Sequence, residues 1–389
     1  MTEYSSATGL ATSAEIYRGR DRRIRELKAA GRKVVGYICC YSPVEVMTAL
    51  DLVPFRLMGN MEEPIVRADG FLPTSMCAFC RSCFDLGIQS RFDFIDGFVG
   101  SHACDAAERV AHIWRTYIKA PCTFFLDLPH TDSSAMVDFF KTQLIHYARA
   151  LEDLAVTKAT PAALKEAIVL HNRQRSLVRS LYRLRRSDPP LVSGSEVLQT
   201  LLALMCIPAQ EGNQLLEQVI AEVQSRRDGP RKKPGRLMIW GSLIDNVCYT
   251  DLIESSGFNI VIEDTAVGAR PFWHDIEITE DPFDGMALHY LREIKCPRTF
   301  SQNDVCFDYT RDLENRFGYL KEFAYHWSVN SAFLNVIRNC DIHGYEIPSV
   351  TDYLESLGLP VLVVEHDYSI AAMEGLRTRF QAFAERIGG

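Results

Sequence analysis

The sequence predicts an α/β protein with two parallel-sheet lobes and a helical middle region, and three observations support this class. The chain has 389 residues, which corresponds to two or three domains at roughly 100–200 residues each. Short β-rich runs alternate with helical patterns in both halves, which is typical of βαβ units and parallel sheets. Between the halves, residues 137–225 show an almost wholly helical pattern.

The first half opens with a basic amphipathic helix predicted over residues 12–32, which ends near Gly31. The next run, residues 33–38, is rich in β-branched and apolar residues and suits a buried parallel strand. Strands are expected in this half at residues 33–38, 55–58, 94–99 and 123–126.

The second half begins after a segment rich in proline and glycine at residues 226–235, which we interpret as a linker. Strands are expected there at residues 236–241, 259–262, 334–337 and 360–364. The patterns divide the chain into an N-terminal helical arm, a first α/β lobe, a helical region and a second α/β lobe. Their predicted bounds are residues 1–32, 33–136, 137–230 and 231–389.

Composition and charge exclude several classes of protein. Hydrophobic residues make up 47% and charged residues 24% of the chain, which is the range of globular proteins and not of disordered or fibrous ones. The net charge of −8 argues against nucleic acid as the main partner. No apolar run approaches the roughly 20 residues of a membrane helix, and the first residues lack a secretory signal. We therefore expect a cytoplasmic protein that binds neither membrane nor nucleic acid.

Two common nucleotide-binding motifs are also missing. The sequence has no Gly-Lys dipeptide, so it has no phosphate-binding P-loop, and it has no Gly-x-Gly-x-x-Gly fingerprint. We expect that the chain neither hydrolyses ATP nor binds NAD by these devices.

Cysteine is the main chemical signal. Of the 12 cysteines in the chain, a dense group falls between residues 39 and 122, and this group consists of Cys39, Cys40, Cys77, Cys80, Cys83, Cys104 and Cys122. In a reducing compartment, thiols gathered in one region bind metal or do chemistry more often than they form disulfides. The grouping therefore predicts a metal or redox site.

Several of these thiols directly follow predicted strands. Cys39 and Cys40 follow residues 33–38, Cys104 follows the strand that ends at Val99, and Cys340 follows a strand of the second lobe. Ligands of parallel sheets collect beyond the carboxyl ends of the strands, so the cleft between the lobes is expected to bring these thiols together.

The same thiols are expected near helix N-termini, where free N–H groups favour a thiolate. The run Ser42 to Glu45 predicts a capping box with proline at the first helical position. Asp105 is the predicted N-cap of the helix after Cys104. The helix that contains Cys77 is expected to have Thr74 or Ser75 as its N-cap and to end at Gly87.

Soft thiolates without an accompanying histidine pattern favour an iron–sulfur cluster over zinc. A four-cysteine zinc site stays open as an alternative, although it usually uses two local pairs and only Cys77 and Cys80 form one. Ligation is favoured for Cys77 and Cys104, and slightly less for Cys39 and Cys340, while it remains open for Cys40, Cys80 and Cys83. The others are predicted to be ordinary core residues, and these are Cys122, Cys206, Cys248, Cys296 and Cys306.

A few charged residues have two interpretations. Arg175, Arg179 and Arg183 recur at four-residue intervals on one helix and either bind the phosphates of a ligand or, as the simpler prediction, form a solvated basic face or an intersubunit contact. Glu45, His102 and Asp105 are candidates for acid–base chemistry, but capping is the simpler role for Glu45 and Asp105. His274 and His343 have no partner that the sequence identifies.

The motifs together resemble a known family. They are residues 36–45, Leu72-Pro73 before Cys77, residues 101–105, Cys340-Asp341, residues 358–362, Glu365 and residues 377–383, with Asn172-Arg173 and residues 181–183 in the helical middle. This combination is similar to the D-component family of 2-hydroxyacyl-CoA dehydratases, which also contains the iron–sulfur subunits of ATP-dependent benzoyl-CoA reductase.

The resemblance implies a heterodimer subunit with two flavodoxin-like lobes and a [4Fe-4S] cluster in the interlobe cleft. Cysteines at the positions of Cys77, Cys104 and Cys340 would hold the cluster, and Cys39 matches a near-cluster cysteine or serine. It further implies a separate activator dimer that hydrolyses ATP and injects one low-potential electron. The cluster would then reduce a CoA thioester to a radical anion, which leads to water loss or to ring reduction.

The chain departs from the family pattern in its surplus of thiols. A pair such as Cys39-Cys40 resembles members with a double-cubane [8Fe-9S] cluster, but Ser90-Arg91-Phe92 stands where those members have a further cysteine, so only Cys80 or Cys83 could substitute. The predicted metal and cofactor ligands are Cys39, Cys40, Cys77, Cys80, Cys104 and Cys340.

The sequence thus predicts the iron–sulfur subunit of a low-potential acyl-CoA enzyme. Because the helical middle resembles the benzoyl-CoA reductase branch most, that type is the first prediction. The alternatives are a 2-hydroxyacyl-CoA dehydratase subunit, a double-cubane reductase of small molecules, and a zinc-stabilised interaction subunit without a redox role.

Overall fold

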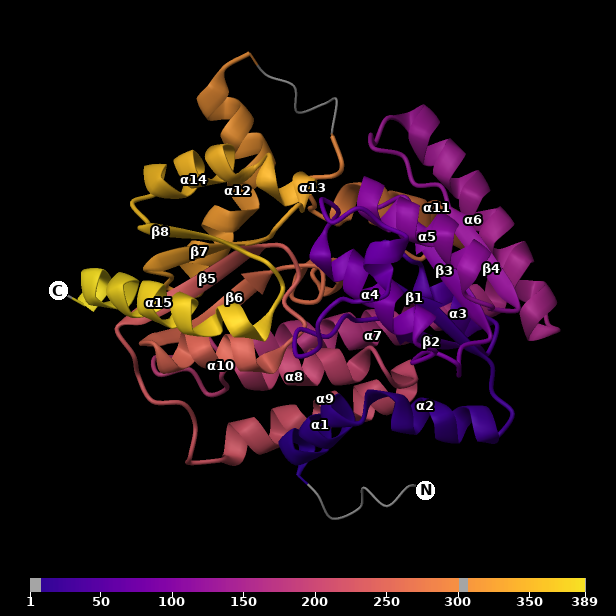
Figure 1. Cartoon of the computed structure of the whole chain (residues 1–389), viewed down its shortest axis with the longest axis horizontal. Coiled ribbons are helices and arrows are strands. Elements are labelled where there is room, and N and C mark those ends of the chain that lie inside the picture. Colours follow the sequence, from indigo (N-terminus) through magenta and orange to yellow (C-terminus); the bar gives the residue numbers. More distant parts are fainter. Residues whose placement is uncertain (1–7, 301–306, 389) are drawn as a thin grey trace.

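The computed structural model describes residues 8–300 and 307–388 and contains two four-stranded parallel sheets, one in each half of the chain (Figure 1). The first sheet has the order β2-β1-β3-β4 and the second has the order β6-β5-β7-β8, so the two share one topology. The strands of the first are β1 (Val34–Tyr37), β2 (Val53–Arg56), β3 (Gly97–Ser101) and β4 (Cys122–Leu126). Those of the second are β5 (Gly235–Gly241), β6 (Phe258–Asp264), β7 (Ser331–Ile337) and β8 (Val361–His366). The predicted α/β class with two parallel-sheet lobes is confirmed.

The first lobe surrounds its sheet with short helices. These are α3 (Val44–Ala49), α4 (Ala78–Ile88) and α5 (Asp105–Tyr117), with a 3₁₀ turn at Ala68–Gly70. The central strands β1 and β3 are buried along their whole length, as expected for a sheet that is covered on both faces. Val35 on β1 pairs with Pro54 on β2 and with Gly97 on β3, so the loops after β1 and β3 leave the same edge of the sheet.

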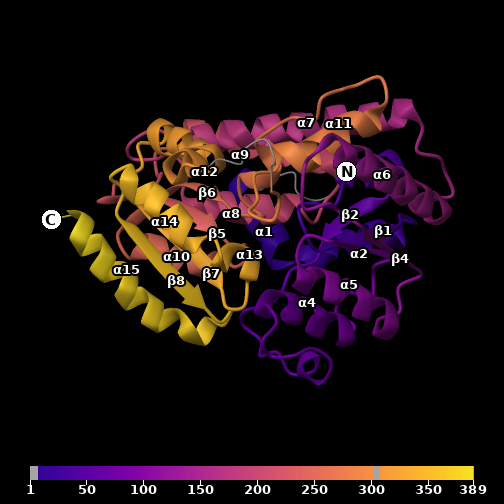
Figure 2. The same cartoon turned by 90° about the horizontal axis from the view of Figure 1, so that it is seen from above.

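The helical middle joins the two lobes (Figure 2). It consists of α6 (Ser134–Ala155), α7 (Pro161–Arg183), α8 (Gly194–Leu204) and α9 (Ala209–Ser225). The first turn of α7 has Pro161 at its start and Thr160 as its cap, and Ser193 with Glu196 forms a capping box on α8. Helix α7 packs against α3 of the first lobe, and α8 packs against β6 and α10 of the second.

The N-terminal arm is two helices, where the sequence predicted one. These are α1 (Gly9–Arg18) and α2 (Arg20–Ala29), separated by Gly19, whose backbone is not helical. The break lets Ile16 on α1 and Ile24 on α2 both reach the core. Helix α1 lies against α8 and α9, so the arm packs on the helical region.

The sheet of the second lobe is accompanied by a larger set of helices. They are α10 (Val247–Ser255), α11 (Pro282–Leu288), α12 (Tyr309–His326), α13 (Asp341–Gly344), α14 (Ile347–Ser356) and α15 (Met373–Gly388). Short 3₁₀ turns occur at Arg270–Phe272 and Ile370–Ala372, and a π-helical turn occurs at His289–Glu293. Helix α11 packs against α6, and the buried apolar side chains of both lobes and the helical region form one continuous core.

The predicted linker agrees with the local structure, since no helix or strand occurs between the end of α9 and the start of β5. The division into four domains stays a prediction. Within residues 8–300 and 307–388, no helix combines the length and the apolar character needed to cross a bilayer.

Candidate metal centre

Four cysteines from the two lobes meet at one place, which we call the four-thiol group: Cys77, Cys80, Cys104 and Cys340. The Cys77 side chain interacts with those of Cys340 and Cys80, and Cys80 also interacts with Cys104, so these thiols shift one another's pKa. Cys77 and Cys80 are buried, while Cys104 and Cys340 are half-buried. The first three come from the first lobe and Cys340 follows β7 of the second, so the structure brings together four of the six predicted ligands.

Three members of the group are themselves helix N-caps. Cys77 caps α4, Cys104 caps α5 and Cys340 caps α13. The prediction of Thr74, Ser75 or Asp105 as caps is therefore wrong, because the thiols occupy these positions. The Cys104 Sγ accepts a hydrogen bond from the Ala107 N–H at 3.4 Å.

The four thiols change one another's acidity. Hydrogen bonds from Cys340 and Cys80, together with the backbone N–H of Cys80, lower the pKa of Cys77 well below that of a free thiol despite its burial. Hydrogen bonding to Cys77, followed by burial, raises the pKa of Cys340 to about 12. A soft cation bound at this group would favour the thiolate forms further, because metal ligation requires deprotonated thiols.

The four sulfur atoms could bind either a single metal ion or a cluster of several metal ions. Among the described residues, no three His, Cys, Asp or Glu side chains are placed to hold a single metal ion. Four sulfur donors supplied by both lobes fit the ligand chemistry of an iron–sulfur cluster, which is a cage of several metal ions held by thiolates.

A second set of thiols lies after β1. The Sγ atoms of Cys39 and Cys40 are 4.0 Å apart, and the hydrogen bond from Cys40, with help from the nearby Arg56, lowers the pKa of Cys39 to about 6. Burial raises the pKa of Cys296, and the charges of both Arg270 and Cys39 act on this thiol. The sequence missed Cys296, because the only signal that links it to Cys39 is spatial.

The remaining cysteines differ in how far they are buried. Cys206 is fully buried, as predicted, and Cys83 is fully buried in α4. Cys122 is half-buried and packs against the core. Cys248 is exposed, so its assignment as a core residue is wrong, because it lies in the first, solvent-facing turn of α10. Cys306 falls outside the described residues.

The predicted capping box after Cys40 is also wrong. Pro43 is the N-cap of α3 and makes no side-chain cap bond. Glu45 is instead fully buried and accepts hydrogen bonds from Arg175 at 2.5 Å and from the Tyr290 hydroxyl at 2.8 Å. Burial alone would raise the pKa of Glu45, but Arg175 and His171 outweigh it and bring the value to about 2.

The arginine row on α7 does not form a solvated face. Arg175 is only 4% exposed and holds Glu45. Arg179 forms a two-pronged ion pair with Asp275 at 2.9 and 3.0 Å, while Arg183 hydrogen-bonds to Ser180 on its own helix. The first two therefore tie α7 to α3 and to the second half of the chain.

Two histidines near the four-thiol group have partners. His102 lies 3.1 Å from Glu108, 3.2 Å from Asp127 and 3.3 Å from His130. His343 was unassigned in the sequence, but its Nδ1 is 3.4 Å from the Cys340 Sγ, and its Nε2 is 3.3 Å from Arg270. The spacing of three residues at a helix start was the signal that could have linked His343 to Cys340. His274 lies 3.5 Å from Glu293.

A cleft of about 590 Å³ opens beside Cys296. Its lining includes the aromatic side chains Trp240 and Phe317, three cations and four carboxylates; the charged residues are Arg292, Lys295, Arg316, Asp132, Glu293, Asp312 and Glu346. Arg316 is already ion-paired with Glu346 and Asp312, so the cleft has no excess of positive charge.

Known proteins of similar sequence identify the family of this chain. The family model of the 2-hydroxyglutaryl-CoA dehydratase D-component matches residues 39–387. The chain is 24% identical over 390 residues to a benzoyl-CoA reductase subunit of Thauera aromatica, which covers 98% of this chain and 99% of that protein. It is 19% identical over 365 residues to the (R)-phenyllactyl-CoA dehydratase beta subunit of Clostridium sporogenes, with 94% of each covered. It is 20% identical over 369 residues to the beta subunit of (R)-2-hydroxyglutaryl-CoA dehydratase of Acidaminococcus fermentans, with 94% and 95% covered. These matches confirm the resemblance drawn from the motifs, and the chain belongs to the 2-hydroxyglutaryl-CoA dehydratase D-component family.

Proposed function

We propose that the chain is the iron–sulfur subunit of an acyl-CoA enzyme of the benzoyl-CoA reductase type. The observation that carries the proposal is the meeting of Cys77, Cys80, Cys104 and Cys340, because four thiols from both lobes match the ligands of an iron–sulfur cluster. The match to a benzoyl-CoA reductase subunit over 98% of the chain supports the specific type. Members of the family are subunits of oxidoreductases or lyases.

In this proposal Cys77, Cys104 and Cys340 hold a [4Fe-4S] cluster, with Cys80 as a further ligand. When bound, such a cluster supplies single electrons at a potential that depends on ligands, hydrogen bonds and burial. The chain contributes N–H donors to sulfur from Cys80 and Ala107. His343 contacts Cys340 and orients that thiol.

Cys39 and Cys40 remain candidate ligands of a larger [8Fe-9S] cluster. Their Sγ atoms lie together, and the charge of Cys296 acts on Cys40, so these three thiols form a second candidate ligand set. Electron paramagnetic resonance on the reduced protein distinguishes one cubane from two by its spin state and spin count.

The substrate proposal is an acyl-CoA. The names of its relatives support it, because they are named for benzoyl-CoA and (R)-phenyllactyl-CoA. We also propose that the chain works in a hetero-oligomer with a homologous iron–sulfur subunit and with ATP-hydrolysing activator subunits. Its relatives are named as single subunits of larger enzymes, and the sequence has no P-loop of its own.

A 2-hydroxyacyl-CoA dehydratase subunit is the second candidate, because relatives that cover 94% of the chain carry that name. Turnover by the assembled complex separates the two: ring reduction of an aromatic acyl-CoA supports the reductase, and water loss from a 2-hydroxyacyl-CoA supports the dehydratase.

Iron analysis of cysteine variants tests the site. We expect Cys104→Ala and Cys104→Ser, purified without oxygen, to lose most of their iron and acid-labile sulfide. The serine variant keeps an N-cap for α5, so its iron loss cannot come from an unravelled helix. Cys206→Ala is the matched control and should keep its iron, because Cys206 is buried away from the group and contacts the Leu202 carbonyl.

Two results would contradict the proposal. Equal iron retention in the Cys104 and Cys206 variants would remove Cys104 from the ligand set. Zinc alone in the wild-type protein, without a brown chromophore, would instead support the zinc-stabilised interaction subunit.

A further inference from the structure

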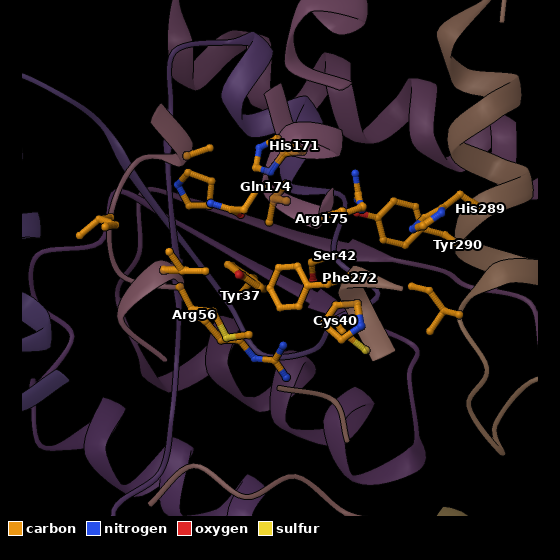
Figure 3. Close-up of a pocket in the computed structure, with 18 residues that line it drawn as sticks. Tyr37, Cys40, Ser42, Arg56, His171, Gln174, Arg175, Phe272, His289 and Tyr290 are labelled. Atoms are coloured by element: carbon orange, nitrogen blue, oxygen red, sulfur yellow. The ribbon is translucent and has the colours of Figure 1, made fainter. Parts of the chain in front are cut away.

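An interior cavity of about 70 Å³ lies where the first lobe, the helical region and the second lobe meet (Figure 3). Tyr37, Cys40 and Arg56 of the first lobe line it, and His171 and Gln174 of α7 lie across from them in the same view. Phe272, His289 and Tyr290 of the second half also line it. The cavity is separate from the four-thiol group, none of whose members lines it.

Several buried polar groups around this cavity have no partner among the described residues. They are Nε and Nη2 of Arg56, Nε2 of Gln174, Nε of Arg175, Oγ of Ser42 and both ring nitrogens of His289. All five residues are at most 7% exposed. Burying a hydrogen-bonding group without a partner costs about 1–3 kcal/mol, and more when the group is charged, so this lining calls for an occupant that accepts hydrogen bonds.

The charge of the lining decides between water and an anion. Arg56 is 1% exposed and forms no ion pair with any described carboxylate. Within the described residues, its guanidinium donates a hydrogen bond to the Ala266 carbonyl at 2.9 Å. Arg175 is neutralised by Glu45. Burial lowers the pKa of His171 to about 4 and the pKa of His289 to about 3, so both rings are neutral at pH 7. No carboxylate in the lining is paired with Arg56, and the Cys39 thiol, whose pKa Arg56 helps to lower, is not one of the lining residues.

The volume of the cavity and the apolar part of its lining limit which anions can bind there. An apolar cavity of about 150 Å³ holds a benzene ring, so about 70 Å³ has room for roughly three or four heavy atoms. One side of the lining is apolar, with Pro54, Leu204, Met205 and Ile207, which disfavours a strongly hydrated dianion such as sulfate. The planar guanidinium of Arg56 matches the two oxygens of a carboxylate.

We propose that this cavity is a binding site for a small monocarboxylate of the size of formate or acetate, recognised by Arg56 and Gln174. The carboxylate oxygens accept the unpartnered N–H groups, and a methyl group faces the apolar wall. The site goes beyond the proposed acyl-CoA function and does not depend on iron at the four-thiol group.

Titration calorimetry on the full chain, purified without oxygen, tests the site with acetate as the probe. We expect saturable binding of one acetate per chain at constant ionic strength, and no such binding with chloride. Arg56→Met should weaken acetate binding at least about tenfold, which is ~1.4 kcal/mol. Arg173→Met is the matched control, because Arg173 lies on α7 with its side chain 57% exposed, and it should bind acetate as the wild type does.

Two more measurements keep the test decisive if Arg56→Met does not fold. Ala209→Val narrows the cavity while leaving Arg56 in place, and Gln174→Leu removes one donor; both should weaken acetate binding. Benzoate, which has nine heavy atoms, should not compete with acetate. Absence of saturable acetate binding in the wild type would show that water or the Cys39 thiolate balances Arg56, and would overturn the proposal. Unchanged binding in Arg56→Met, or in Ala209→Val and Gln174→Leu together, would also overturn it.

Discussion

Glu45 shows at the scale of one residue how burial changes a predicted role. Its place three residues after Ser42 suggested a helix cap, which is an exposed and local function. In the structure its carboxylate lies at 0% exposure between Arg175 and Tyr290, and it connects the first lobe to α7 and to the turn that contains Tyr290. A charge pair that is removed from water stabilises only while both members are present.

We therefore expect Glu45→Gln to lower the free energy of unfolding by about 3–5 kcal/mol, because it leaves the Arg175 charge buried without a counter-charge. Glu217→Gln is the matched control on the exposed pair with Arg173, whose side chains are 57% and 53% exposed, and it should change stability by less than about 1 kcal/mol. Chemical denaturation of both variants measures the difference. Equal effects would show that the Glu45 pair is not the buried link described above.

At the scale of the element, the end of β5 depends on a glycine that the strand pattern does not reveal. Gly241 has φ of +137°, and a Cβ at this position would lie 2.1 Å from the Asn335 carbonyl oxygen on β7. This close approach brings the Ser242 N–H to the same carbonyl at 2.8 Å. The glycine thus fixes the carboxyl edge of the second sheet, from which Cys340 follows.

Gly241→Ala should lower the free energy of unfolding by roughly 2 kcal/mol or more, since it adds backbone strain and a clash with β7. Gly375→Ala in α15 is the control, because a Cβ there meets no atom within 4 Å. That change should be neutral or stabilise the protein by up to about 1 kcal/mol. Thermal unfolding of the two variants decides the matter, and a harmless Gly241→Ala would refute this account of the sheet edge.

At the scale of the whole molecule, three buried histidines make folding sensitive to acid. Burial lowers the pKa of His171 and His366 to about 4, and that of His289 to about 3. In the unfolded chain these rings take up protons near pH 6.5. Between about pH 6.5 and 4 the unfolded chain therefore binds more protons than the folded one, and stability falls as the pH falls through this window.

One such imidazole costs about 2 kcal/mol between pH 8 and pH 5, because about 1.5 pKa units of the window lie above pH 5. His366→Phe should reduce the loss of stability between these two pH values by about that amount. His146→Phe, at an exposed position, should leave the loss unchanged. Denaturant titrations at pH 8 and pH 5 measure this loss of stability. An identical loss in His366→Phe and in the wild type would contradict the low pKa of His366.

The local pattern of residues determined much of this protein. Apolar runs placed all eight strands to within a few residues, and the thiols after β1, β3 and β7 were identified because position along a strand is a local property. The motifs also identified the family. Periodicity over ten residues records which side of an element is buried, but it does not record which distant element covers that side.

Tertiary packing decided the rest. Only the folded chain shows that Cys340 reaches Cys77, that Cys296 lies by Cys39 and that Arg56 is buried without a carboxylate. It also placed thiols at the cap positions and drew Arg175 and Arg179 into ion pairs with Glu45 and Asp275. These contacts join residues that are far apart in the sequence. Their energies depend on the removal of water and on the close packing of the two lobes, and a single stretch of sequence does not encode either.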